Sequence, residues 1–159
     1  MVGSEVSASP MVAAAMKVMD PQKILDGLSA TVAMRFRLLI LGLAALGYGR
    51  VRLTSGLRSL DTEMVLYGKG RTKEECLQDG VPKIYARPAQ AKVTWIQPCE
   101  SKHVKGYAVD VTWMAYTVLN WDVVARLASD LGILWGGNWI VKDRGHFELD
   151  GGVRQWAEQ

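Results

Sequence analysis

The 159-residue sequence contains little of several residue types that would define a protein class by themselves. Its two cysteines, Cys76 and Cys99, are too few for the disulfide framework of a small secreted domain, so we expect both thiols to be reduced. Charged residues make up 22% and apolar residues 49% of the chain, which is the composition of a globular protein and not of a disordered one. A net charge of +3 is too small to indicate binding to nucleic acid.

Long apolar runs are also missing, because none reaches the roughly 20 residues that span a bilayer. The most hydrophobic segment, residues 38–46, lies between Arg37 and Arg50, and we expect it to form part of a core helix. The short apolar stretch at residues 11–16 follows no basic region, so we expect no secretion signal and no transmembrane segment.

The length suits one domain, and the sequence contains no repeat or linker, so residues 1–159 are predicted to form a single domain. Residues 1–9 are small and polar, and we expect them to be flexible. Prolines that follow capping side chains predict helices at residues 10–19 and 21–28. Ser29 can cap a third helix over residues 30–46, ended by Gly47 and Gly49. Its apolar stripe has helical spacing and consists of Val32, Phe36, Leu39, Leu43 and Leu46.

Strands are predicted mainly in the second half of the chain. The expected elements after residue 49 are a strand at 50–55, a helix at 61–67, a long loop at 68–91, strands at 92–96 and 107–113, a helix at 121–131, a segment at 133–140 broken by two glycines, and a strand at 145–149. Because helices come first and strands are gathered later, the order favours an α+β fold over a doubly wound sheet.

The chain has only two histidines, and each lies near a carboxylate. His103 is seven residues before Asp110, and Gly106 between them lets the backbone turn, so a loop histidine and a strand aspartate can converge. His146 and Glu148 are two apart on a predicted strand and share a face. Neutral imidazole and carboxylate groups are good zinc ligands, and three protein ligands plus water form the catalytic pattern.

Asp143 lies three residues before His146, close enough for its carboxylate to approach a metal's water without ligating the metal. Two neutral histidines and one aspartate leave a zinc site with net charge +1, which lowers the pKa of bound water to roughly 7. Asp143 is then a candidate general base, and Glu148 is either its rival or a group that orients a ligand. A structural zinc site that uses Cys99 with His103 stays open as an alternative, although it would need two further ligands.

Four short segments together resemble a known family. They are S-G-L-R-S at 55–59, S-K-H-V-K-G-Y-A-V-D at 101–110, W-G-G-N-W at 135–139 and D-R-G-H-F-E at 143–148. In this order they are similar to the motifs of the zinc D-alanyl-D-alanine carboxypeptidases, a family that includes the L-alanyl-D-glutamate endopeptidases used as phage endolysins. The resemblance covers about residues 50–149 and implies a small α+β domain with an antiparallel sheet, against which the N-terminal helices pack.

The resemblance implies a Zn²⁺ ion held by His103, Asp110 and His146, with Asp143 as general acid and base. It gives Arg58 a role in polarising the scissile carbonyl or in holding a substrate carboxylate. Four further residues become candidates for supporting a ligand or contacting substrate: Glu148, Ser101, Glu63 and Trp139. Glu63 departs from the family pattern, in which glutamine is frequent at this position.

The function that the resemblance implies is a cell-wall hydrolase. We expect a monomeric, phage-type endolysin that cleaves the L-alanyl-D-glutamate bond of the peptidoglycan stem peptide. It would be made in the host cytoplasm and reach the wall when the membrane is breached. A D-Ala-D-Ala carboxypeptidase is the nearest alternative, and a non-catalytic wall-binding module of the same fold is a rival of another class.

Overall fold

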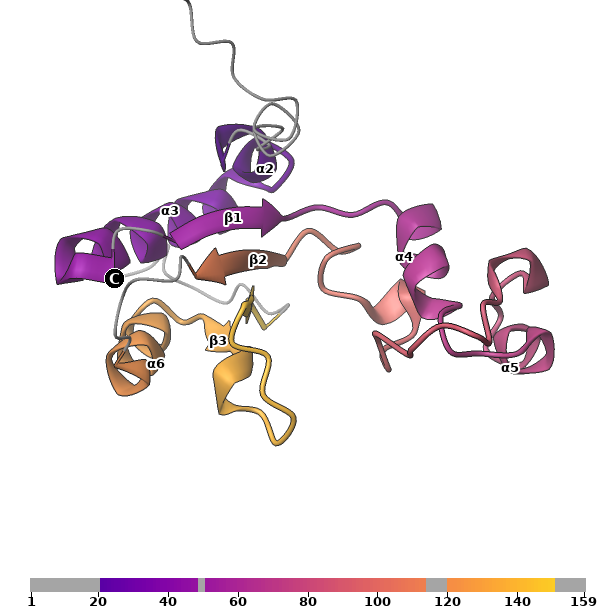
Figure 1. Ribbon diagram of the computed structural model, residues 1–159. Helices are drawn as coiled ribbons and strands as arrows, with labels where there is room; N and C mark the ends of the chain where they lie inside the picture. Colours follow the sequence, from indigo (N-terminus) through magenta and orange to yellow (C-terminus); the bar gives the residue numbers. More distant parts are fainter. Residues whose placement is uncertain (1–20, 49–50, 114–119, 151–159) are drawn as a thin grey trace, which may run out of the picture.

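The computed structural model describes residues 21–48, 51–113 and 120–150 (Figure 1). In these ranges the strands form one antiparallel sheet in the order β1-β2-β4-β3. The strands are β1 (Val51–Ser55), β2 (Ala108–Trp113), β3 (Leu134–Trp135) and β4 (His146–Glu148). Helices precede and flank the sheet, so the predicted α+β fold with a small antiparallel sheet is confirmed.

Two helices precede the sheet, α2 (Pro21–Asp26) and α3 (Ala30–Leu43). The Ser29 side chain caps α3 by accepting a hydrogen bond from the backbone nitrogen of Val32, as the sequence predicts. A π-helical turn, η1 (Ala44–Tyr48), continues α3, and Gly47 has a φ of 83° within it. A φ of this sign suits glycine and ends the helix. The helix predicted at residues 10–19 lies outside the described residues.

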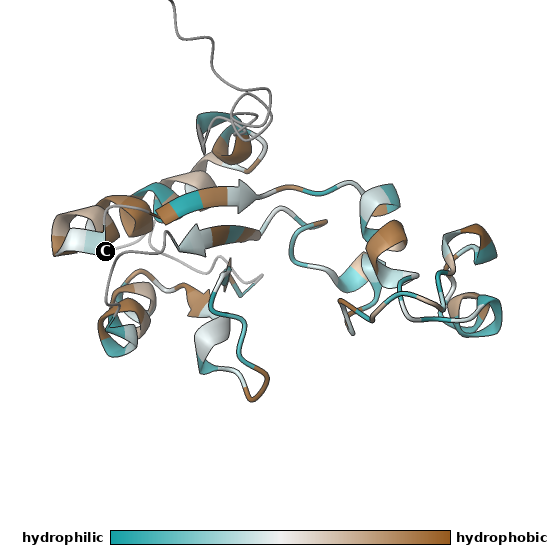
Figure 2. Ribbon diagram, viewed as in Figure 1, coloured by the Kyte–Doolittle hydropathy of each residue, from teal (hydrophilic) through white to brown (hydrophobic). Residues whose placement is uncertain are grey.

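The core lies between α3, α6 (Trp121–Asp130) and the sheet. Brown and teal bands alternate along β1 and β2 in Figure 2, as expected for strands that cover a core with one face. Four of the five stripe residues predicted for α3 are buried, namely Val32, Phe36, Leu39 and Leu43. The prediction for Leu46 is wrong, because this residue lies in the π-helical turn, where the helical register has changed, and is 53% exposed.

Residues Ala30–Tyr48 also form, in the described part of the chain, one helix that is long and apolar enough to cross a membrane by length and composition. Core helices and signal sequences can have the same character, and the buried stripe of α3 packs in the core. Its exposed apolar side chains include Met34, Leu38 and Leu41. The expected absence of a secretion signal therefore stays a prediction.

Two expectations between β1 and β2 are wrong. The region predicted as a loop contains α5 (Lys73–Gln78) and a 3₁₀ turn at Lys83–Tyr85, after α4 (Leu60–Tyr67). Thr72 and Glu75 form a capping box at the start of α5, a sequence signal that predicts this helix when it is considered. The strand predicted at residues 92–96 is irregular. Instead of pairing in a sheet, the Thr94 carbonyl accepts a hydrogen bond from the Arg71 guanidinium.

Candidate metal centre

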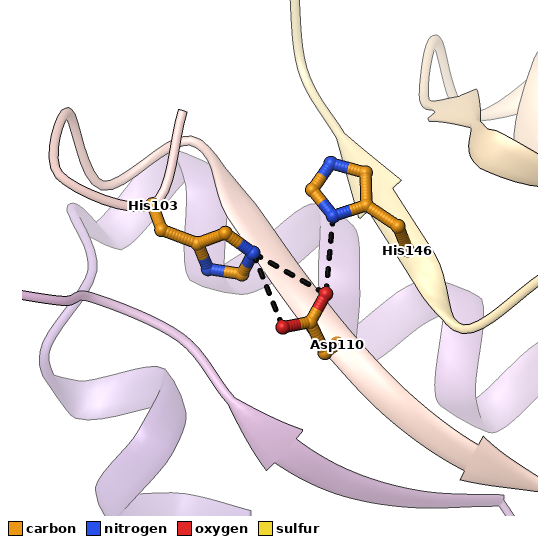
Figure 3. Close-up of side chains that lie close together, drawn as sticks. All are labelled: His103, Asp110 and His146. Carbon is orange, nitrogen blue, oxygen red and sulfur yellow. Dashed lines mark hydrogen bonds and ion pairs between the residues drawn. The ribbon is translucent and has the colours of Figure 1, made fainter. Parts of the chain in front are cut away.

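Three segments bring His103, Asp110 and His146 together (Figure 3). Asp110 lies on β2, directly opposite His146 on β4 in the antiparallel register. His103 comes from the turn before β2, where Gly106 has a φ of 75° and donates its backbone N–H to the His103 carbonyl. One potential ligand atom from each residue lies within 4.8 Å of the other two. The structure thus brings together the three residues that the resemblance implies as metal ligands.

The ring of His103 has a defined orientation. Its Nδ1 is 2.8 Å from the backbone oxygen of Gly56, and because a carbonyl only accepts, Nδ1 carries the proton. Nε2 is therefore the nitrogen left to bind a metal ion, and it lies 3.2 Å from Asp110 Oδ1. Gly56 is needed for this approach, since an added Cβ would lie 2.9 Å from the backbone oxygen of Ile24. Sequence reasoning missed Gly56 as a partner of the metal centre, although it belongs to the S-G-L-R-S segment.

His146 is held from both sides. Its Nδ1 is 3.0 Å from Asp110 Oδ1, and its Nε2 is 3.0 Å from Glu148 Oε2. Glu148, one of the predicted supporting residues, therefore fixes the ring through the nitrogen that faces away from the trio. A carboxylate that binds the far nitrogen of a ligand histidine sets its tautomer and raises its basicity. This contact favours Glu148 as an orienting group over Glu148 as general base.

The donor set fits a zinc ion. Two imidazoles and one carboxylate present ligand atoms to a common point, and the second nitrogen of each ring is already engaged. Among the described residues, the group that could hold a metal contains no cysteine, and Cys99 is exposed and free. The alternative zinc site with Cys99 is therefore without support in the geometry.

The electrostatics of the trio follow from its close contacts. Burial alone would raise the pKa of Asp110, but hydrogen bonds and the charges of His103 and His146 outweigh it, and the pKa is well below its usual range. Burial would lower the pKa of His146, but hydrogen bonds to Asp110 and Glu148 raise it from 6.5 to about 9. The metal-free centre thus holds a proton that a metal ion would replace.

Arg58 lies beside the trio with its guanidinium in contact with two carboxylates. Its Nη1 is 2.7 Å from Glu63 Oε2, and its Nη2 is 3.4 Å from Asp110 Oδ2 and 3.1 Å from Ser55 Oγ. The Glu63 side chain is only 3% exposed. The backbone N–H of Arg58 also donates to the His103 carbonyl. The structure therefore places both predicted residues at the centre and pairs them with each other.

Asp143 lies on the exposed loop that precedes β4, and this loop is held by backbone contacts. The Gly136 carbonyl accepts from the backbone nitrogens of Asp143 and Trp139 at 3.0 and 3.1 Å. The indole N–H groups of Trp113 and Trp135 both donate to the Arg144 carbonyl, at 2.8 and 3.0 Å. This role of the two indoles in anchoring the Asp143 loop is not visible in the sequence.

The trio lies in a cleft with a volume of about 780 Å³, which Arg58, Glu63 and Asp143 also line. Trp139 forms part of the wall, with its ring centroid 5.1 Å from that of His146, and Ser101 is buried at its edge. The irregular segment mispredicted as a strand supplies another part of the wall through exposed apolar side chains. They are Val93, Trp95 and Ile96.

Residues 96–149 match the family model of D-alanyl-D-alanine carboxypeptidase. This segment, about a third of the chain, is similar to that family. It contains the complete trio and Asp143, so the predicted resemblance is confirmed and the chain is a metallopeptidase. No curated protein sequence matches the chain.

Solved structures similar to the peptidase include the L-Ala D-Glu endopeptidase ChiX of Serratia marcescens, at 23% identity and a TM-score of 0.46, with 84% of this chain and 88% of that chain covered. The D,D-pentapeptidase VanY of a VanB-type resistance cassette, crystallised with Zn(II), has 18% identity and a TM-score of 0.48 over 77% and 72% of the two chains. DacB of Streptococcus pneumoniae D39 has 22% identity and a TM-score of 0.46 over 78% and 67%. Likenesses at this level add nothing about the bond that the peptidase cleaves.

Proposed function

We propose that the peptidase is a zinc-dependent peptidoglycan hydrolase that cleaves the L-alanyl-D-glutamate bond of the stem peptide. The observation that carries the proposal is the convergence of His103, Asp110 and His146 in an open cleft, within a segment that matches the carboxypeptidase family. When bound, zinc supplies Lewis-acid chemistry, polarising a carbonyl and making water acidic near neutral pH.

In this proposal the chain's own residues bind the peptide and move the proton. Asp143 lies on the rim of the cleft, where its exposed carboxylate can take a proton from the attacking water and return it to the leaving amine. Arg58 stands beside Asp110 and can stabilise the negative charge that develops on the carbonyl oxygen. The exposed walls around Trp95 and Trp139 can exclude water from a bound peptide.

The charges in the cleft favour an endopeptidase over a carboxypeptidase. A carboxypeptidase must hold a terminal carboxylate, for which an unpaired cation is the usual partner. Among the described lining residues, Arg58 contacts Glu63, Lys102 lies 3.8 Å from Asp150, and Lys142 donates to the Gly137 carbonyl. Arg58 and Lys102 are therefore paired with carboxylates, and the Lys142 ammonium is held by a neutral backbone carbonyl.

The proposal is tested by digestion of purified bacterial cell walls with wild-type protein, the Asp143→Ala variant and EDTA-treated protein. We expect the wild type alone to reduce turbidity and to release new D-glutamate amino termini, while Asp143→Ala binds zinc and releases none. Release of free D-alanine without clearing would assign the carboxypeptidase activity instead. Absence of any product from zinc-loaded wild type would contradict the proposal and favour a wall-binding module.

We propose an endolysin role as the biological setting of this activity. Lysis requires that the enzyme open the wall itself, which endopeptidase cleavage does and carboxypeptidase trimming does not. Addition of the protein to whole cells with permeabilised outer membranes tests this role. We expect loss of viability with the wild type and none with Asp143→Ala, and cleavage of isolated walls without cell lysis would contradict the endolysin role alone.

A further inference from the structure

The guanidinium of Arg58 is surrounded by negative charge. Glu63 lies on the first turn of α4, five residues after Arg58, and its nearly buried carboxylate is 2.7 Å from Nη1. Asp110 approaches the other terminal nitrogen at 3.4 Å. The Arg58 cation in the cleft wall is therefore paired with carboxylates of the protein itself.

The rest of the cleft carries further charges, which act on Arg58 less directly than Glu63 does. Among the described lining residues, the carboxylates are Glu63, Glu100, Asp110, Asp143 and Glu148, against the cations Arg58, Lys102 and Lys142. Glu100 is exposed and pairs with Lys105 at 2.7 Å, away from Arg58. Glu63 is therefore the carboxylate outside the metal trio that acts directly on Arg58, and it does so from a position shielded from solvent.

A carboxylate at position 63 differs from glutamine in charge more than in shape. A glutamine amide oxygen can accept the same hydrogen bond from Arg58, so the orientation of the guanidinium does not require glutamate. What glutamate adds is one negative charge next to the substrate-facing cation. Such a charge weakens the binding of a negatively charged substrate group at this site. It leaves the binding of an uncharged group nearly unchanged.

The stem peptide carries, next to the scissile bond, a group that can be either charged or neutral. D-Glutamate continues the peptide through its side-chain carboxyl group, so its α-carboxyl group is either a free carboxylate or an amide. We propose that Glu63 makes the cleft selective for stem peptides in which this group is the amide, D-isoglutamine. The inference rests on the proposed L-alanyl-D-glutamate cleavage, and it assigns Glu63 as a specificity-determining residue.

The test compares two peptides that differ only in this group, N-acetyl-L-alanyl-γ-D-glutamyl-L-lysine and its D-isoglutaminyl analogue. For each we would measure kcat/KM with the wild type, Glu63→Gln and Glu100→Gln, and equilibrium binding to the same forms carrying Asp143→Ala. We expect the wild type to prefer the amide, and Glu63→Gln to shift the ratio toward the carboxylate about tenfold, the effect of one charge roughly 6 Å away under partial screening. Glu100→Gln removes a charge from the same cleft and should leave the ratio unchanged.

Each outcome decides a separate point. Equal kcat/KM values of the wild type for the two peptides would overturn the inference. This comparison uses the wild type alone, so it does not depend on whether a variant folds. A Glu63→Gln protein that lowers kcat/KM for both peptides alike would make Glu63 a positioning residue for Arg58, and it also overturns the inference. If the wild type cleaves neither peptide, the proposed function fails, while the binding ratio still decides the selectivity.

Discussion

The imidazole of His146 lies between two carboxylates, with Asp110 3.0 Å from Nδ1 and Glu148 3.0 Å from Nε2. Because β2 and β4 are paired in register, Asp110 and His146 face each other across the sheet. Glu148 is two residues further along β4 and therefore on the same face as His146. The strand geometry thus places side by side two residues that could bind a metal ion, together with the carboxylate that orients one of them.

This arrangement predicts that Glu148 supports metal binding without ligating the metal. Replacing Glu148 with alanine removes the acceptor for Nε2, and we expect zinc affinity to fall about 10- to 100-fold. Glu148→Gln keeps an amide oxygen that can accept from Nε2, so its zinc affinity should fall less than that of Glu148→Ala. Competition with a chromogenic chelator measures both values, and Glu100→Ala, which lines the same cleft without contacting the trio, is the control. Equal zinc affinities for Glu148→Ala and wild type would show that Glu148 has no role in metal binding.

The raised pKa of His146 predicts a pH dependence of the metal-free protein. The folded-state pKa of about 9 exceeds the ordinary 6.5, so the protonated ring stabilises the fold fully below pH 6.5, and this contribution is lost as pH rises toward 9. We expect the free energy of unfolding of EDTA-treated protein to fall by a few kcal/mol across this window. Urea titrations at several pH values measure it. Zinc-loaded protein should lack this decline, because the metal replaces the proton.

The convergence of His103 and Asp110 could be predicted from the sequence because both lie in one short segment, whereas only the family resemblance implied that His146 joins them. Gly106 and the alternation of β2 place His103 and Asp110 without reference to distant residues. The same is true of the Ser29 and Asn120 caps, whose side chains accept from nearby backbone nitrogens. Local signals of this kind describe helix starts and strand faces well.

Contacts between distant segments could not be predicted in this way. Residues 92–96 have the β-branched composition of a strand, but the Arg71 guanidinium occupies the Thr94 carbonyl and the segment becomes a cleft wall. The pairing of Arg58 with Glu63 depends on how α4 follows β1, and two tryptophans meet at the Arg144 carbonyl only in the folded sheet. The amino-acid composition of a segment indicates its local strand propensity. It does not show which distant residues the segment will contact in the folded protein.

The close approach of Gly136 to the loop that carries Asp143 predicts an effect of a single methyl group. A Cβ added at Gly136 would lie 2.4 Å from the Asp143 carbonyl oxygen, so the loop that carries Asp143 must move. We expect Gly136→Ala to lower kcat by about tenfold or more with zinc content unchanged, because displacement of Asp143, the proposed general base, affects turnover before metal binding. Gly27→Ala is a matched control, since its nearest contact would be 3.4 Å. Loss of zinc together with activity would show a wider disruption.

The two cysteines should differ in reactivity. Cys76 is fully buried beside Tyr67 and Val81, and burial raises the pKa of its thiol, whereas Cys99 is exposed. Because the thiolate is the reactive form, we expect a thiol reagent to label Cys99 rapidly and Cys76 only after unfolding. Mass spectrometry of the labelled native protein counts the modified sites. Two rapid modifications would mean that the α4–α5 region opens in the native state.

The two faces of α3 predict whether this apolar helix belongs to the core in solution. Leu39 is fully buried, and Leu41 is 65% exposed two residues away. Leu39→Ala should cost about 2–5 kcal/mol of unfolding free energy because it leaves a cavity, while Leu41→Ala should change it by at most about 0.5 kcal/mol. Urea unfolding of the two variants measures the difference, and their identical chemistry makes each a control for the other. Equal and small losses would mean that α3 is not packed in the core, and a helix with both faces free would then be a candidate for insertion into a membrane.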